Sequence, residues 1–184
     1  ILVCLVGSEM CIRDRFSMLG RLIERADKTS RILDVKYYLL LPSLDELGGV
    51  LDELQWISLL RSAGAYQMFR KAEQNSIRPN AVARFLLLDP IFPRSIRFCL
   101  DGISETLQVI SFNPIPGEPT QLDCMRGLLK AKWSYIRIES IMKSGLHEAI
   151  DNLQIDLNKL HKLIHQQYFS NQELLSQEEF NHEN

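Results

Sequence analysis

The chain has 184 residues, of which 46% are hydrophobic and 24% are charged, and its formal net charge at pH 7 is −2. These values are ordinary for one globular domain, and the slightly acidic balance argues against general binding to nucleic acids or anionic membranes. The four cysteines show no CxxC spacing, which argues against a disulfide scaffold or a zinc ribbon. We therefore expect a cytoplasmic protein with no nucleic-acid or membrane partner and no cofactor.

The beginning of the chain differs in character from the rest. Residues 1–6 form an apolar run that is too short for a membrane helix and lacks the basic start of a signal peptide. The string from Val6 to Arg15 is similar to a translated sequencing adapter. We expect residues 1–15 to be a non-native segment, with a native N-terminal helix or strand as the alternative. A helical domain is then expected over residues 16–170, followed by a polar, frayed tail over residues 171–184.

Apolar residues recur at helical spacing along most of the chain, and the intervening loops hold most of the prolines and several glycines. The segments expected to be helical are residues 16–40, 51–74, 79–88, 93–112, 121–142 and 146–169. No segment alternates apolar and polar residues with a period of two, so no sheet is expected. The predicted fold is all-α: a bundle of about six helices with up-and-down packing.

The helix expected over residues 16–40 carries the most charge. One face is expected to hold the stripe Leu19, Leu22, Ile23, Ala26, Ser30, Leu33, Tyr37 and Leu40. Oppositely charged residues three or four apart, such as Asp27 and Arg31, can pair along the other faces. Exposed pairs of this kind contribute only about 0.3–0.5 kcal/mol each, so stability alone explains them poorly. Either this face is solvated and paired with itself, or it contacts another helix, a partner or a ligand. The candidate interface or binding residues on it are Arg21, Glu24, Arg25, Asp27, Arg31 and Asp34.

Asp89 and Arg94 are the remaining candidates, and no catalytic residue is assigned. Asp89 is expected to accept hydrogen bonds from backbone amides, as Asp does at helix N-termini. Arg94 would lie in the first turn of a helix that opens at Pro93, where the helix dipole disfavours a cation. We therefore expect Arg94 to have a partner, namely a carboxylate from the helix over residues 16–40. A phosphate held by Arg94 and free amides is the alternative.

Other reactive side chains have simpler interpretations. His161 and His165 share a helix face, but a third ligand and the HExxH glutamate are missing, so no metal site is expected. Cys99 is most simply a small core residue. His147 follows a turn marked by Gly145 and is expected to cap the last helix.

Part of the helix expected over residues 16–40 resembles the signature of the bacterial alpha-E domain family. The matching residues are Gly20-Arg21, Glu24-Arg25-Ala26-Asp27 and the run from Thr29 to Val35. This family is a helical domain of unknown function with a Glu-Arg motif. Further matches occur at Gln55-Trp56 with Leu59 to Ser62, at Phe85 to Asp89, at Phe92 to Ile96 with Phe98-Cys99, and at Gly145 to His147 with Asp151 and Gln154. The resemblance covers roughly residues 16–169. It is expected to represent the C-terminal half of the family domain only, with the N-terminal half missing.

The resemblance implies a setting for the protein rather than a reaction. Genes of this family tend to lie beside genes for an ATP-grasp-type ligase and a transglutaminase-like protease. A non-catalytic partner or scaffold in a peptide-ligation or protein-modification system is therefore expected, with those two proteins as partners. The alternative is an enzyme or ligand-binding domain with an ionic interhelical cleft around Glu24, Arg25, Asp27 and Arg94. Charges paired between buried helices would favour a brace, whereas unpaired charges converging in a pocket would favour a site.

Overall fold

The computed structural model describes residues 2–39, 50–72, 77–110 and 118–170, and within the first helix it describes the side chains of residues 12–36. All regular secondary structure in these ranges is helical, which confirms the all-α prediction. The helices are α1 (Leu2–Leu39), α2 (Val50–Ser62), α3 (Tyr66–Ala72), α4 (Pro79–Leu88), α5 (Ile96–Ile110), α6 (Gln121–Tyr135), α7 (Ile138–Ser144) and α8 (Leu146–Tyr168). None of the described helices combines the length and apolar character that crossing a bilayer requires.

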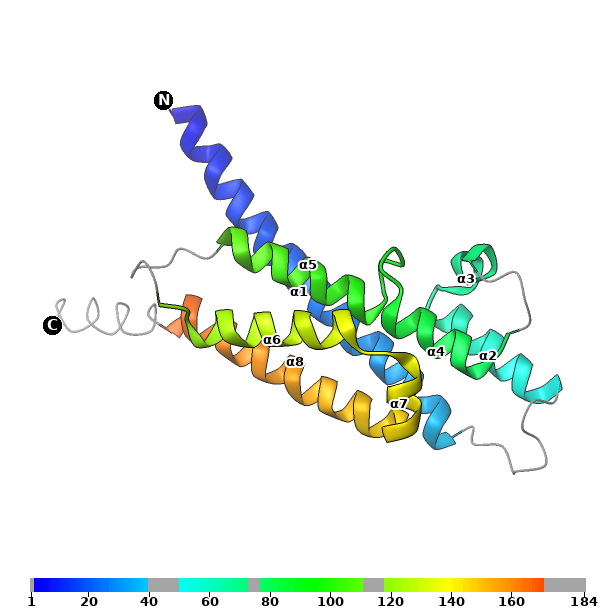
Figure 1. Cartoon of the computed structure of the whole chain (residues 1–184). Helices are drawn as coiled ribbons and strands as arrows, with labels where there is room; N and C mark the ends of the chain where they lie inside the picture. The colour runs from blue at the N-terminus through cyan, green and yellow to red at the C-terminus, as the bar shows by residue number, and fades with distance from the viewer. Residues whose placement is uncertain (1, 40–49, 73–76, 111–117, 171–184) are drawn as a thin grey trace, which may run out of the picture.

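The helix α1 runs through the middle of the bundle and packs against α2, α4, α5 and α8 (Figure 1). Ser30 of α1 meets Gln154 of α8 and Asp34 meets His147, so residue numbers rise on one helix as they fall on the other. The helices α1 and α8 are therefore antiparallel. On the outside, α6 packs on α5 and α8, and α7 packs on α4 and α8. This arrangement is the expected bundle of antiparallel neighbours.

The predicted apolar stripes of α1, α5 and α8 are largely buried. On α1 the buried members of the stripe are Leu19, Leu22, Ala26, Ser30 and Leu33. The predicted stripes of α5 and α8 are also buried, apart from the half-buried Ile110. Tyr37 and Leu40, which were expected to continue the α1 stripe, lie outside the described side chains. At the crossing of α1 and α5, a Cβ atom on Gly102 would lie 3.0 Å from a methyl carbon of Leu22. The absence of a side chain at Gly102 therefore lets these two helices approach closely.

The expected helix over residues 51–74 is interrupted between α2 and α3, so that prediction was wrong at its centre. Gly64 has a φ angle of +63°, which favours glycine. Its amide donates to the carbonyl of Arg61 at 2.9 Å, and the amide of Ala65 donates to that of Leu60 at 2.7 Å. This pair of bonds is the Schellman motif that ends many helices. Gly64 was therefore the signal in the sequence that the prediction overlooked.

Three other helix boundaries differ from expectation. The expected helix over residues 121–142 is divided by Ile136 and Arg137, which are extended, with ψ angles of 142° and 146°. Neither proline nor glycine marks this break in the sequence. The helix α5 begins after Ser95 rather than at Pro93, because the Ser95 hydroxyl accepts the Phe98 amide at 3.1 Å and caps the helix there. The helix α1 begins well before residue 16, since no proline interrupts the run that precedes it.

A buried ion pair joins α1 to α2. Lys36 Nζ lies 2.8 Å from Asp52 Oδ1, and the two side chains are only 5% and 4% exposed. The same ammonium donates to Gln55 Oε1 at 2.5 Å and lies 5.0 Å from the centre of the Trp56 ring. Burial of a charge is costly unless its partner and hydrogen bonds are present. The α1–α2 contact therefore depends on both members of this pair, which the sequence analysis did not identify.

His147 was expected to cap α8, but it links α8 to α1 instead. Its Nδ1 lies 2.8 Å from Asp34 Oδ1, and the N-cap position is occupied by Gly145. The hydrogen bond with Asp34 raises the pKa of His147 above its ordinary value of 6.5. Burial opposes this rise in the pKa, and the carboxylates of Asp34, Glu148 and Asp151 add to it. The link is therefore strongest when the imidazole is protonated.

We expect Lys36→Met to lower the free energy of unfolding by about 3–5 kcal/mol, because the Asp52 carboxylate would remain buried without its cation. Urea denaturation followed by circular dichroism measures this change. The double variant Lys36→Met/Asp52→Leu should recover most of the loss. An equal loss in the single and double variants would contradict an explanation based on the unpaired charge.

We also expect the stabilising effect of Asp34 to depend on pH. Because the pKa of His147 is higher in the folded state, the stabilisation is fully present below pH 6.5 and is lost as the pH rises through the raised pKa. Asp34→Asn should therefore lower the free energy of unfolding more at about pH 6 than at about pH 9, as measured by urea denaturation. The same substitution in a His147→Gln background should show no such difference. A pH-independent loss in the parent chain would rule out the imidazolium as the cause.

Candidate functional site

The structure distributes the sequence-predicted site residues over two pockets and two ion pairs. Those that line the first pocket are Arg21, Glu24, Arg25 and Arg94. Asp27 and Arg31 pair with each other on the outer face of α1. Asp34 faces His147 of α8, and Asp89 borders the second pocket. The single ionic cleft expected around Glu24, Arg25, Asp27 and Arg94 is therefore formed without Asp27.

Two carboxylates of α1 are paired within the helix itself. Glu24 accepts a hydrogen bond from Lys28 Nζ at 2.5 Å, and Asp27 accepts one from Arg31 Nε at 2.8 Å. The hydrogen bond from Lys28 lowers the pKa of Glu24, and the bond to Asp27 raises the pKa of Arg31. These four residues therefore pair within α1 in the way that their spacing of four predicts. The lowered pKa of Glu24 favours its ionised form, so Glu24 is poorly suited to act as a general acid near neutral pH.

The first pocket lies where α1, the end of α2 and the turn before α5 meet, and its volume is about 340 Å³. Four basic side chains line it, against the single carboxylate of Glu24, which is engaged by Lys28. Arg21, Arg25 and Arg94 have no carboxylate partner among the residues that the structure describes. Three arginines thus line one hollow with a net positive charge, and Nε of Arg21 also donates to the carbonyl of Ser17 at 3.4 Å. Such a concave cationic site attracts anions.

Arg94 is held at this pocket by contacts with both α1 and α2. Its Nη1 donates to the carbonyl of Ala63 at the end of α2, at 3.1 Å, where the helix dipole favours a cation. Its own carbonyl accepts a hydrogen bond from Thr29 of α1 at 2.8 Å. A Cβ atom on Gly64 would come within 2.7 Å of Nη1, so this glycine leaves room for the guanidinium. The expected carboxylate partner for Arg94 was wrong, because Arg94 precedes α5 and a helix-end carbonyl satisfies it instead.

Asp89 shapes the turn that carries Arg94. Its Oδ1 accepts the amides of Ile91 and Phe92 at 2.8 Å and 2.7 Å, which confirms the expected role as a backbone acceptor. Its carbonyl accepts a hydrogen bond from the Ser95 hydroxyl. Because Asp89 occupies these two amides, they are not free to bind a phosphate beside Arg94. An anion in the first pocket would therefore be held by side chains.

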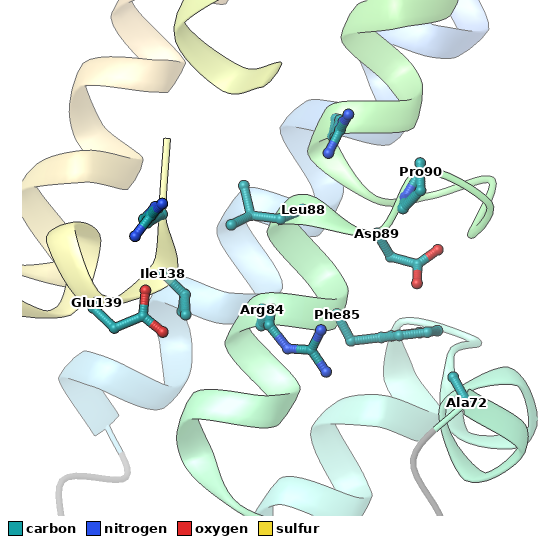
Figure 2. A pocket seen from close by; sticks show the side chains of 10 residues that line it. Ala72, Arg84, Phe85, Leu88, Asp89, Pro90, Ile138 and Glu139 are labelled. Atoms are coloured by element: carbon teal, nitrogen blue, oxygen red, sulfur yellow. The ribbon is translucent and has the colours of Figure 1, made fainter. Parts of the chain in front are cut away.

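The second pocket, of about 460 Å³, lies between α4, α5 and α7. Its charged lining residues are Arg84, Asp89, Arg97, Arg137 and Glu139. Figure 2 shows Glu139 on α7 across the hollow from Arg84 on α4, with Asp89 at the end of α4. This lining contains both acidic and basic side chains. In addition, Nε of Arg97 lies 3.9 Å from Oδ2 of Asp101. The excess of positive charge in the second pocket is therefore smaller than in the first pocket. For this reason we take the first pocket as the candidate site.

The described lining of the first pocket offers no nucleophile paired with a base. The hydroxyls of Thr29 and Ser62 donate to backbone carbonyls. Cys99 lies nearby on α5, and burial raises the pKa of its thiol to about 12 although the Arg25 charge lowers it. Its role as a small core residue is confirmed. Across the described ranges, no three His, Cys, Asp or Glu side chains come together as metal ligands. The geometry is thus suited to binding an anion.

Sequence reasoning missed the pocket residues that come from α2. Ser62 and Ala63 line the pocket beside Thr29, yet none of the three has a side chain that signals a binding role by its type. The available signal was Gly64, because a glycine after a helical run marks a helix end, and helix ends carry unsatisfied carbonyls that attract basic side chains.

We expect Arg25→Ala to leave the free energy of unfolding within about 0.5 kcal/mol of the parent value. Arg25 is exposed and makes no hydrogen bond or ion pair within the described parts of the chain. Urea denaturation measures the change, with Arg31→Ala on the outer face of α1 as the matched control. A loss of more than about 2 kcal/mol for Arg25→Ala alone would show that Arg25 braces the fold instead of serving a site.

Glu24 and Arg25, which border the first pocket, form the one Glu-Arg pair in the chain. The Alpha-E family, a predicted alpha-helical domain with a conserved ER motif, matches residues 12–169. This range covers most of the chain, so the expectation that only the C-terminal half of the domain is represented is not borne out. No curated protein and no solved structure shows a significant match to the chain. The chain belongs to the Alpha-E family.

Proposed function

We propose that this protein is a non-catalytic helical partner in a cytoplasmic peptide-ligation or protein-modification system that includes an ATP-grasp-type ligase and a transglutaminase-like protein. In this proposal residues 16–170 form the binding domain. The observation that carries it is that Arg21, Arg25 and Arg94 line one pocket, whose described lining provides no nucleophile with a base. The domain would use this pocket to hold an acidic group of a partner protein.

The chemistry of the pocket supports a carboxylate as the bound group. A guanidinium presents two parallel N–H donors that match the two oxygens of a carboxylate. Hydrogen bonds to charged groups contribute about 1.5–3 kcal/mol each, more than a neutral bond. A hollow of about 340 Å³ has room for an acidic side chain or a chain terminus. Peptide ligation acts on carboxyl groups, so a domain that holds them fits such a system.

The alternative is an enzyme or ligand-binding domain that takes a small free anion into the same pocket. An acid–base enzyme would need a group that exchanges protons near neutral pH. The hydrogen bond from Lys28 lowers the pKa of Glu24, the single acid of the lining, which disfavours that role. Binding of a free anion without catalysis uses the same guanidinium groups. The test must therefore separate a protein-borne acid from a free one.

Affinity purification of the complete protein from its host cell, followed by mass spectrometry, tests the proposal. We expect an ATP-grasp-type ligase or a transglutaminase-like protein to co-purify with the parent chain. Arg25→Glu should abolish this association, because it reverses a charge inside the first pocket. Arg31→Glu is the matched control and should retain it, because Arg31 lies outside the pocket and pairs with Asp27 on the exposed face of α1.

Two outcomes would contradict the proposal. If neither the ligase nor the transglutaminase-like protein co-purifies with the parent chain, the partner role is contradicted. If the Arg25→Glu variant recovers as much of the partner protein as the parent chain does, the first pocket does not bind that partner. If phosphate or a small dicarboxylate binds the pocket by calorimetry while no protein co-purifies, the small-ligand alternative replaces the proposal.

A further inference from the structure

A third hollow, distinct from the second pocket, adjoins the candidate site and is lined mainly by apolar side chains. It is a groove of about 510 Å³ between α1 and α2. Val35 of α1 and Leu51 and Leu54 of α2 line it, and these side chains are 47%, 55% and 53% exposed. Single exposed leucines are common on protein surfaces, but several that share a concave surface mark an interaction site.

Among the residues that the structure describes, the groove has one charged lining residue, and its charge is paired. Lys36 is its basic lining residue, and the ammonium is held by Asp52 and Gln55 inside the bundle. The apolar side chains around it therefore present a surface that favours apolar groups. An ion entering the groove would lose hydration and would meet no unpaired charge among the described lining residues.

The groove and the cationic pocket form one continuous surface, because Ile32 and Ser62 line both. The helix α2 runs antiparallel to α1, since Lys36 meets Asp52 near the start of α2 and Thr29 lies beside Ser62 at its end. Along α1 the distance from Arg25 to Val35 is about 15 Å at 1.5 Å per residue. One short peptide segment is long enough to occupy both hollows.

From this juxtaposition we propose that the α1–α2 groove and the adjoining pocket together bind one amphipathic segment of a protein partner. Its apolar side chains fill the groove, and its carboxylate reaches the guanidinium groups of Arg21, Arg25 and Arg94. Amphipathic helices commonly bind apolar grooves in this way. The inference rests on the proposed function, since it uses the same pocket, and it adds the chemistry of the segment that is recognised. Charge complementarity selects an acidic segment over a basic one.

A labelled probe peptide tests this inference by fluorescence anisotropy with the full chain. The probe spans about four helical turns, carries leucines at helical spacing and ends in two glutamates. One control peptide has lysines in place of the glutamates, and another has serines in place of the leucines. We expect the chain to bind the probe, and each control peptide to bind roughly tenfold or more weakly.

Variants of the chain then locate the binding surface. Leu54→Asp should weaken binding of the probe roughly tenfold or more, because it places a charge in the groove. Ile155→Asp is the matched control and should leave binding unchanged, since Ile155 is 56% exposed on α8. Arg25→Glu should weaken binding of the probe and strengthen binding of the peptide with lysines, because it reverses a charge in the pocket.

The outcomes separate this inference from the proposed function. If Arg25→Glu abolishes the association with the ligase or protease while Leu54→Asp changes neither that association nor probe binding, the function stands and the groove is excluded. If no probe binds the parent chain, the inference is overturned, and affinity purification still decides the function independently. Concentration-dependent dimerisation in light scattering that Leu54→Asp abolishes would assign the groove to a second copy of the chain and would also overturn the inference.

Discussion

The buried stripe of α1 is the constraint on which the rest of the structure depends. Leu22, Ala26 and Leu33 are almost fully enclosed, and a helix cannot bury such a stripe without neighbours. Neighbouring helices therefore surround α1, among them α5 and α8, and each adds its own buried stripe to the same core. Arg21, Glu24, Arg25 and Lys28 lie on the face of α1 that this packing leaves open. That face borders the end of α2, which is where the first pocket forms.

The pocket follows from the way α2 ends. A helix end leaves carbonyls without partners inside the helix, and the turn at Gly64 exposes the carbonyl of Ala63 to the guanidinium of Arg94. Thr29 binds the backbone of Arg94 and fixes the turn against α1. Satisfying a helix end thus brings Arg94 to the same hollow as Arg25. One guanidinium contributes to the fold and to the positive charge of the site.

The neighbouring groove presents an apolar surface because the charge of its buried cation is paired. Lys36 is enclosed with Asp52, so the α1–α2 contact holds a charge while the surface above it stays apolar. An apolar groove that continues into a cationic pocket matches a segment with apolar side chains and an acidic end. This combination supports a partner protein over a small anion, which would use only the pocket. In the described lining, the hydroxyls of Thr29 and Ser62 both donate to backbone carbonyls and are not paired with a base.

The sequence by itself determined the all-α class, the buried faces of α5 and α8 and the pairing of Asp27 with Arg31, because helical periodicity and contacts between residues four apart are local. It did not determine the division at Ile136, where no proline or glycine marks the break. The tertiary structure alone decided that Arg94 pairs with Ala63, a residue 31 positions earlier. It also decided that Arg25 shares a pocket with Arg94 whereas Asp27 does not. The physical reason is that helical periodicity indicates which face of each helix is buried, whereas the helix ends and open faces that meet are set by the packing of the whole bundle.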